Sequence, residues 1–223
     1  MPIDKRQARA LRKGFAEWSG TFDEDTFGPM RWTAPRTLAD RLKPQLRDGD
    51  RMLDLGCGTG QSPALYAPLR LRWSGADISA AMLALAARNG AYESLRRMNI
   101  DRRRYPFAAR SFDAVVSSGV FEFTAHLGQA LREIARILRP GGHLAMTAEA
   151  PSRDELDFEV FESDEYYYIR YRYSRRLVET LLREAGFEPL ECEKFPAYRN
   201  EYGRDIFYFA FLARRMDSRE TCI

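Results

Sequence analysis

Three glycines that follow a short apolar segment constrain the fold of this chain more than any other feature. The string reads Leu53-Asp54-Leu55-Gly56-Cys57-Gly58-Thr59-Gly60. Glycines between a first strand and a helix let the backbone approach a ligand without a clash at Cβ. A dinucleotide fingerprint needs the spacing G-x-G-x-x-G, whereas the third glycine comes one residue early here, and the Gly-Lys-Ser/Thr ending of a P-loop is absent. The string predicts a ligand-binding turn in an α/β protein and disfavours a nicotinamide-dependent oxidoreductase.

Short apolar segments and helical patterns alternate on both sides of this turn. Strands are expected over 51–55, 72–77, 95–100, 112–117 and 143–148, and helices over 34–46, 61–67, 79–88, 126–138 and 174–185. Units of this size favour parallel strands with helices on both faces of the sheet. Segments 187–195 and 205–214 are separated by a short polar loop and predict an antiparallel hairpin.

The two flanking regions are richer in aromatic residues. Ala8, Leu11, Phe15 and Trp18 recur at spacings of three and four, which predicts an amphipathic helix over 4–19. Residues 20–34 mix glycines with aromatic side chains and are expected to form an ordered loop. Residues 150–173 carry aromatic side chains interleaved with charges, either as packing over a sheet edge or as a wall of a substrate site.

The bulk composition narrows the possible partners. The 223 residues include 35 basic and 32 acidic side chains, a formal charge of +3, and the basic residues are dispersed. No apolar run approaches the length of a membrane span, and no nucleic-acid-binding appendage is visible. Three cysteines and two histidines predict reduced thiols, a cytoplasmic protein and no metal site, and the excess of arginine over lysine is typical of G+C-rich bacteria. The cluster Arg102-Arg103-Arg104 is either a solvated turn or an attractor of an anionic substrate.

The glycine string resembles the first motif of class I S-adenosylmethionine-dependent methyltransferases, and further motifs of that family follow in order. Asp77 ends the second expected strand, 17 to 19 residues after Gly60 and Gly58, and matches the acid that in the family binds both ribose hydroxyls. The segments 99–101, 112–118 and 138–142 resemble the later motifs. The resemblance assigns cofactor binding to Trp32, Asp54, Gly56, Cys57, Gly58, Asp77, Ile78, Met82, Asn99, Ile100 and Ser117.

Within the family, the resemblance is closest to the Williams–Beuren-region methyltransferase-like proteins and to methyltransferase domains attached to TPR repeats. It is carried by residues 17–18, 21–25, 32–35, 173–174 and 199–203. Phe22 and Trp32 stand where this subgroup usually has tyrosine. The subgroup resemblance makes the N-terminal segment a lid over the cofactor.

The resemblance therefore implies an α/β, Rossmann-like, doubly wound fold. Its seven-stranded sheet is mostly parallel and ends in an antiparallel C-terminal hairpin. The expected single domain, 1–223, comprises a helical lid (1–48), a cofactor-binding core (49–149), an acceptor-side insertion (150–173) and a late helix with the hairpin (174–215).

Three of the assigned residues have a structural alternative. Asp54 can bond backbone amides of the glycine turn, Cys57 can be a small buried filler, and Met82 can be ordinary core. For Asp77, a mere helix-capping role is disfavoured, because Ser79 already fills that role.

Methyl transfer from a sulfonium is an in-line displacement, so the protein mainly aligns a nucleophile and excludes water. A general base is needed only where the acceptor is protonated. Glu122, His126 and Glu149 follow the fourth and fifth strands and are the candidates, with His126 alternatively facing solvent. Arg170 and Arg172 either grip an acidic acceptor or point to solvent.

The segment after the fourth strand excludes some acceptors. It reads Ser117-Ser118-Gly119-Val120 rather than the Asn/Asp-Pro-Pro-aromatic string of amide and adenine amino methyltransferases, and no Pro-Cys pair offers a thiolate for cytosine. We expect a small-molecule acceptor methylated on oxygen, nitrogen or carbon, with no nucleic acid or membrane as partner. The rival hypothesis is a non-catalytic module that binds S-adenosylmethionine or its product.

Overall fold

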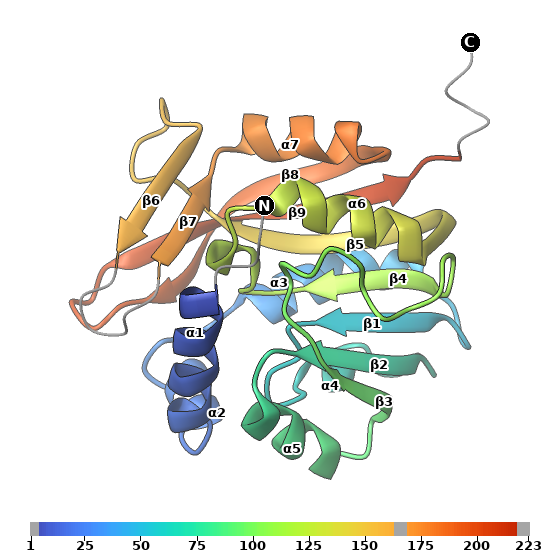
Figure 1. Ribbon diagram of the computed structural model, residues 1–223, viewed down its shortest axis with the longest axis horizontal. Helices are drawn as coiled ribbons and strands as arrows, with labels where there is room; N and C mark the ends of the chain where they lie inside the picture. The colour runs from blue at the N-terminus through green and yellow to red at the C-terminus, as the bar shows by residue number, and fades with distance from the viewer. Residues whose placement is uncertain (1–4, 163–168, 218–223) are drawn as a thin grey trace.

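A seven-stranded sheet forms the centre of the molecule (Figure 1), in a computed structural model that describes residues 5–162 and 169–217. Its spatial order is β3 (Tyr92–Arg97), β2 (Arg72–Asp77), β1 (Arg51–Leu55), β4 (Phe112–Ser117), β5 (Leu138–Glu149), β9 (Asp205–Arg215) and β8 (Phe187–Arg199). The first five strands are parallel, whereas β9 is antiparallel to both β5 and β8. The predicted fold class and the C-terminal hairpin are confirmed.

Helices cover both faces of this sheet because successive strand residues point to opposite sides. On one face, Val115 and Leu144 pack under α6 (Leu127–Ile137) and α7 (Arg175–Glu184). On the other face, Ala114 and Ala145 pack against α3 (Ala34–Leu42), which continues into a 3-10 turn, η1 (Lys43–Gln45). Figure 1 shows α6 and α7 on the viewer's side of the sheet and α3 behind it. The remaining helical elements are α1 (Lys5–Trp18), α2 (Phe22–Phe27), α4 (Ser62–Leu65), α5 (Ala80–Arg88) and η2 (Phe121–Phe123).

The aromatic insertion folds as a second, two-stranded antiparallel sheet. It consists of β6 (Phe158–Glu162) and β7 (Ile169–Tyr173), which pair from Phe158–Tyr173 to Glu162–Ile169. Three of the insertion's tyrosines, Tyr166 to Tyr168, lie outside the described residues.

The helix caps expected from the sequence are present. Ser79 precedes α5 and accepts a hydrogen bond from the backbone N–H of Met82, and Ser174 precedes α7 and accepts one from Leu177. Each serine satisfies a donor that has no partner within its helix, which sets where the helix begins.

Three expected boundaries were wrong. The segment 20–34 was expected to be a loop, but it contains α2, whose first turn holds Asp23, Glu24 and Asp25, where acidic side chains favour a helix N-terminus. Strand β3 begins three residues earlier than expected, because its exposed charged residues lie at the sheet edge and hide the apolar pattern. Strand β5 already begins at Leu138, which pairs with Phe112 before an irregularity in the register.

Candidate active site

The carboxyl ends of β1, β2 and β4 meet at one edge of the sheet, where the order of the strands reverses. Strand β1 lies between β2 and β4, and chain connections leave this point in opposite directions. Such a switch point opens a crevice in which α/β proteins bind their ligands. The glycine turn follows β1, Asp77 ends β2, and Ser118 and Gly119 follow β4.

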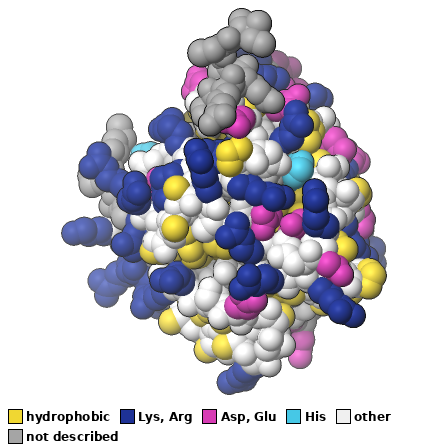
Figure 2. Space-filling model, turned by 90° about the vertical axis from the view of Figure 1, so that its right-hand side faces the viewer, with side chains coloured by type: hydrophobic (Ala, Val, Ile, Leu, Met, Phe, Trp, Pro, Cys, Tyr) yellow, Lys and Arg dark blue, Asp and Glu magenta, His cyan; other side chains and the backbone are white. Residues whose placement is uncertain are grey.

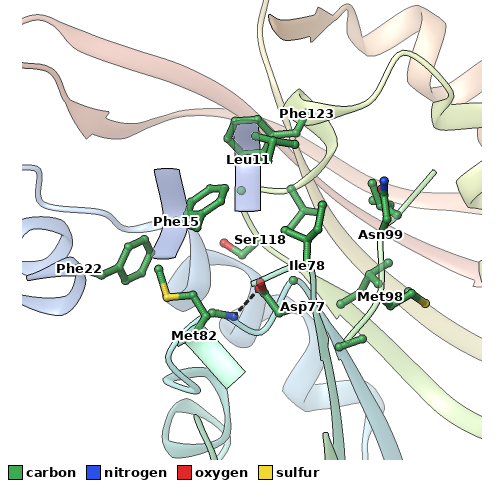
Figure 3. A pocket seen from close by; sticks show the side chains of 17 residues that line it. Leu11, Phe15, Phe22, Asp77, Ile78, Met82, Met98, Asn99, Ser118 and Phe123 are labelled. Atoms are coloured by element: carbon green, nitrogen blue, oxygen red, sulfur yellow. Dashed lines mark hydrogen bonds between the residues drawn. The ribbon is translucent and has the colours of Figure 1, made fainter. Parts of the chain in front are cut away.

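A pocket lies at this position and encloses about 690 Å³ of empty space, part of it open to solvent. Figure 3 shows the lining side chains converging from the sheet edge, α5 and the N-terminal helices. The lining residues are Leu11, Phe15, Phe22, Leu55, Gly56, Gly58, Ala76, Asp77, Ile78, Met82, Met98, Asn99, Ile100, Ser118, Gly119, Val120 and Phe123.

The glycine turn requires glycine because Gly56, Gly58 and Gly60 all adopt positive φ, a backbone conformation that side chains disfavour. Gly56 has φ +80° and Gly58 has φ +51°. A Cβ on Gly56 would lie 2.1 Å from Val120 Cγ2, so glycine is required there for space as well as for φ. The turn is anchored by Ala76, whose carbonyl accepts from the N–H groups of Gly56 and Cys57 at 2.7 and 3.1 Å.

Asp77 is the one charged side chain among the described residues that line the pocket. Its Oδ2 accepts from the Gly58 N–H at 3.0 Å, and its Oδ1 accepts from the Ser79 N–H at 2.8 Å. Burial raises the pKa of this carboxyl, whereas the backbone donors oppose the rise. Each oxygen keeps a second lone pair, so the carboxylate is positioned to accept from two hydroxyl groups of a ligand.

Three of the residues assigned from the sequence lie behind the pocket rather than in its lining. Asp54 is buried and accepts from the Tyr92 hydroxyl at 2.7 Å, and burial raises its pKa to about 6. Cys57 is a buried free thiol whose Sγ faces Gly75, 2.9 Å from where a Cβ on that residue would lie. Ser117 donates to the Leu55 carbonyl at 2.8 Å. Each of them supports the segments that form the pocket.

The N-terminal helices close one side of the pocket through Leu11, Phe15 and Phe22. Phe15 also meets the Phe123 ring edge to face, with centroids 5.6 Å apart. Asp23 fastens this cover to the glycine turn, because its carboxylate accepts from Thr59 Oγ1 and Gln61 Nε2, each at 2.6 Å. The cover therefore touches both the glycine turn and the segment after β4.

A buried cluster of charged side chains lies beside the pocket. Glu149, at the end of β5, is 1% exposed and pairs with Arg170 at 2.5 Å and Arg172 at 2.8 Å. Arg172 also contacts Glu159 at 3.2 Å. The alternative in which these arginines point to solvent is therefore wrong, whereas a role in gripping an acidic acceptor stays a prediction, and neither side chain lines the pocket.

Glu122 belongs to the same cluster and lies next to the pocket wall. It is 3% exposed, and burial raises its pKa to about 7, while the Arg170 charge opposes that rise. Gly119 lines the pocket, and a Cβ built on it would lie 3.5 Å from Glu122 Oε1. Of the three residues predicted as a possible general base, Glu122 thus lies beside the pocket. Glu149 lies behind it and is paired with two arginines.

The remaining two predicted residues lie at the edges. His126 is half-buried at the start of α6, and its backbone N–H donates to Thr124 Oγ1 at 2.8 Å. Trp32 is half-buried against Gly119, 2.9 Å from where a Cβ on that glycine would lie, and packs on Tyr198 and Tyr208. Neither lines the pocket, and their roles stay predictions.

Sequence reasoning missed several residues that this arrangement brings together. Tyr208 is central to the buried cluster and carried no sequence signal. The N-terminal segment was expected as a lid from the subgroup resemblance, but its individual residues Leu11 and Phe15 were predicted only as one face of a helix. The residues missed in this way are Leu11, Phe15, Asp23, Thr59, Gln61, Phe123, Tyr198 and Tyr208.

Comparison with known proteins agrees with this geometry. Residues 53–146 match a family model described as a methyltransferase domain. The chain is similar to the demethylmenaquinone methyltransferase of Corynebacterium urealyticum, with 36% identity over 121 residues that cover 54% of this chain and 50% of that protein. Over eight curated relatives that it matches, the chain spans between 36% and 61% of the length of the relative.

Solved structures share the fold over nearly the whole chain. The 1,6-didemethyltoxoflavin-N1-methyltransferase of Burkholderia thailandensis, solved with S-adenosylhomocysteine bound, has a TM-score of 0.75 at 19% identity and covers 97% of this chain and 93% of its own. The [4+2]-cyclase SpnF also has a TM-score of 0.75, at 20% identity, with 97% and 98% covered. The fold is therefore shared by proteins with different activities.

The sheet and the glycine turn agree with the match of residues 53–146 to a methyltransferase domain, and a solved structure that shares the fold holds S-adenosylhomocysteine.

Proposed function

We propose that this protein transfers the methyl group of S-adenosylmethionine to an oxygen, nitrogen or carbon atom of a small molecule. The observation that carries the proposal is the pocket at the switch point, which combines the glycine turn, the Asp77 carboxylate and an apolar cover. In this proposal Asp77 accepts hydrogen bonds from the ribose hydroxyls. Ile78, Met82, Asn99 and Ile100 border the adenine, and Gly56 and Gly58 lie against the methionine part.

When bound, the cofactor supplies the electrophilic methyl group. The chain's own contribution is to bind it, exclude water and hold the acceptor in line. The apolar cover of Leu11, Phe15 and Phe22 excludes water over the pocket, and Asp23 holds that cover on the glycine turn. Glu122 is the base that we propose for a protonated acceptor, because it is the buried carboxyl next to Gly119 and its pKa of about 7 matches neutral pH.

The acceptor that we propose is a small metabolite in the cytoplasm of a bacterium. The family resemblance of the N-terminal segment supports kinship with the Williams–Beuren-region and TPR-associated methyltransferases. One relative is named for a quinone precursor, demethylmenaquinone, so a lipid-soluble acceptor is included in the proposal. Within the described residues, no helix is both long and apolar enough to cross a membrane.

The end of the molecule away from the pocket carries mixed charges rather than an unbroken basic surface (Figure 2). Figure 2 shows the end of the molecule where the parallel strands begin, and acidic side chains lie among its many basic ones. Several of these basic groups are paired, as in Arg72 with Glu93 at 2.9 Å and Arg214 with Glu188 at 2.7 Å. Paired charges give a weaker field for a polyanion than an unbroken basic surface does.

The test is incubation of the pure protein and methyl-labelled S-adenosylmethionine with a bacterial metabolite extract, followed by mass spectrometry. We expect one labelled product with the wild-type protein and a loss of at least about tenfold with Glu122→Gln at pH 7. Tight binding of S-adenosylhomocysteine without any labelled product would instead support the second hypothesis, a non-catalytic cofactor-binding module, and the SpnF likeness shows that this fold is not confined to methyl transfer.

A further inference from the structure

The hydroxyl of Tyr208 connects charged side chains that come from three other segments of the chain. Tyr208 lies on β9, is 1% exposed and donates to Glu122 Oε1 at 2.9 Å. It accepts from Arg170 Nη2 at 2.8 Å and lies 3.5 Å from Glu149 Oε2. A phenol has one proton to donate, and the shorter of the two carboxylate contacts of this hydroxyl is the one with Glu122.

The ring that carries this hydroxyl is held on two sides. Trp32 packs edge-on against Tyr208 with centroids 5.4 Å apart, and Tyr198 does so at 6.2 Å. The Tyr198 hydroxyl accepts from Arg170 Nη1 at 3.0 Å. The guanidinium of Arg170 thus binds both tyrosine hydroxyls and Glu149, so Tyr208 has little freedom to turn away from Glu122.

This arrangement leaves Glu122 half satisfied. Its Oε1 is bonded to Tyr208, while Oε2 is buried and has no hydrogen-bond partner among the described residues. A buried carboxylate oxygen without a donor costs free energy comparable to a lost hydrogen bond or more. The Glu122 atom nearest the pocket wall is Oε1, 3.5 Å from where a Cβ on Gly119 would lie, and Gly119 lines the pocket without a side chain of its own.

The charges of the cluster explain why Tyr208, rather than an arginine, contacts Glu122. Glu149 takes up both guanidinium groups, Arg170 at 2.5 Å and Arg172 at 2.8 Å. A direct ion pair with an arginine would lower the pKa of Glu122 and make it a weak base. A phenol also orients the carboxyl but lowers that pKa less. A base oriented by a third group is a recurrent catalytic arrangement.

We infer that Tyr208, held by Arg170, is a positioning residue that orients the Glu122 carboxyl beside the pocket wall at Gly119, and that the acceptor carries an O–H or N–H group whose proton this carboxyl takes. This inference rests on the proposed function and narrows its acceptor to a protic nucleophile. As the acceptor's oxygen or nitrogen forms its bond to the methyl carbon, the carbon–sulfur bond breaks and S-adenosylhomocysteine is left. The acceptor's proton passes to the Glu122 carboxylate and is released to water when the pocket opens.

The first test needs no acceptor. In protein labelled with ¹³C at the glutamate side-chain carboxyls and saturated with S-adenosylhomocysteine, the Glu122 signal, assigned by its loss in Glu122→Gln, is titrated by NMR. Tyr208→Phe removes the hydrogen bond that holds the pKa of Glu122 down, so we expect that pKa to rise in the variant. Tyr66→Phe is the matched control, because Tyr66 is also buried and its hydroxyl has no partner among the described residues. An unmoved Glu122 titration in Tyr208→Phe overturns the inference.

The second test follows the labelled product formed from the metabolite extract. We expect the rate of Tyr208→Phe to fall about tenfold at pH 7, the loss of roughly one hydrogen bond, and to recover at higher pH, with affinity for S-adenosylhomocysteine unchanged. A methyl group found on carbon, or a pH profile like that of the wild type, overturns the inference while the proposed function stands. A wild-type protein that forms no product refutes the proposed function itself, whatever Tyr208 does to the titration.

Discussion

The end of the pocket that we propose holds the cofactor and the end that we propose faces the acceptor are built in different ways. The cofactor end comes from short continuous segments, the glycine turn at 56–60, the β2 end at 77–82 and residues 98–100, and it presents mainly backbone and apolar side chains. The buried cluster beside the acceptor end joins Glu122, Glu149, Arg170 and Tyr208 from four separate elements. The proposed cofactor site is therefore formed by local backbone geometry, whereas the cluster that we propose acts on the acceptor is brought together only by the folded chain.

The largest effect is expected when the buried cluster loses a charge. Arg170→Met leaves Glu149 with Arg172 alone and removes a donor from Tyr208. Breaking a buried ion pair on one side costs about 3–5 kcal/mol, and urea unfolding should show a loss of that size. The control is Arg176→Met, which breaks a pair with Asp157 whose side chains are 80% and 41% exposed, for which we expect at most about 1 kcal/mol. Equal losses of unfolding free energy in the two variants would show that the Arg170–Glu149 pair is no more buried in solution than the exposed Arg176–Asp157 pair.

The second effect depends on pH. Burial raises the pKa of Glu122 from its ordinary value of 4.5 to about 7 in the folded state. The folded state therefore loses stability as pH rises from the ordinary pKa to the raised one, because the unfolded chain ionises more easily. Glu122→Gln should match the wild type in stability near pH 4 and exceed it above pH 7, by on the order of 3 kcal/mol. Thermal unfolding from pH 4 to 9 measures the difference, and a difference that is constant across this range contradicts the assignment. The same substitution is expected to remove activity, so stability and function should change in opposite directions.

A smaller effect is expected in the cover that spans the two ends. Asp23→Ala removes the two bonds to Thr59 and Gln61, and we expect S-adenosylhomocysteine to dissociate about tenfold faster, as for one charge-assisted bond in a partly exposed site. Glu24→Ala is the matched control, because Glu24 is exposed on the same helix.

Hydrogen exchange over residues 10–35 gives an independent measurement of the cover. We expect slower exchange there when the cofactor is bound, as for a sequestering lid. An exchange rate over these residues that is the same with and without cofactor would contradict the lid. The cover would then not couple the two ends of the pocket.

The same contrast explains what could be predicted from the sequence. The glycine turn and Asp77 at the end of the second strand were predicted from local spacing and family motifs, and both line the pocket. The mostly parallel seven-stranded sheet was implied by the family resemblance and is confirmed. Tyr208 could not be predicted, because its partner Glu122 is 86 positions away and a tyrosine in a C-terminal strand carries no motif. The roles of Arg170 and Arg172 stayed open for a related reason: residues two apart share a face of a strand, but nothing local identifies Glu149 as the group opposite them.

The most direct test of the central claim, that this pocket holds S-adenosylmethionine with Asp77 at the ribose, is calorimetry of S-adenosylhomocysteine binding. We expect micromolar affinity for the wild type and none for NAD. Asp77→Ala should weaken binding by at least about a hundredfold, since two charge-assisted hydrogen bonds contribute about 1.5–3 kcal/mol each before relaxation. Ser79→Ala, which removes only the cap of α5, should keep its affinity and so separates ligand contact from local structure. Binding by Asp77→Ala as tight as that of the wild type would contradict the account.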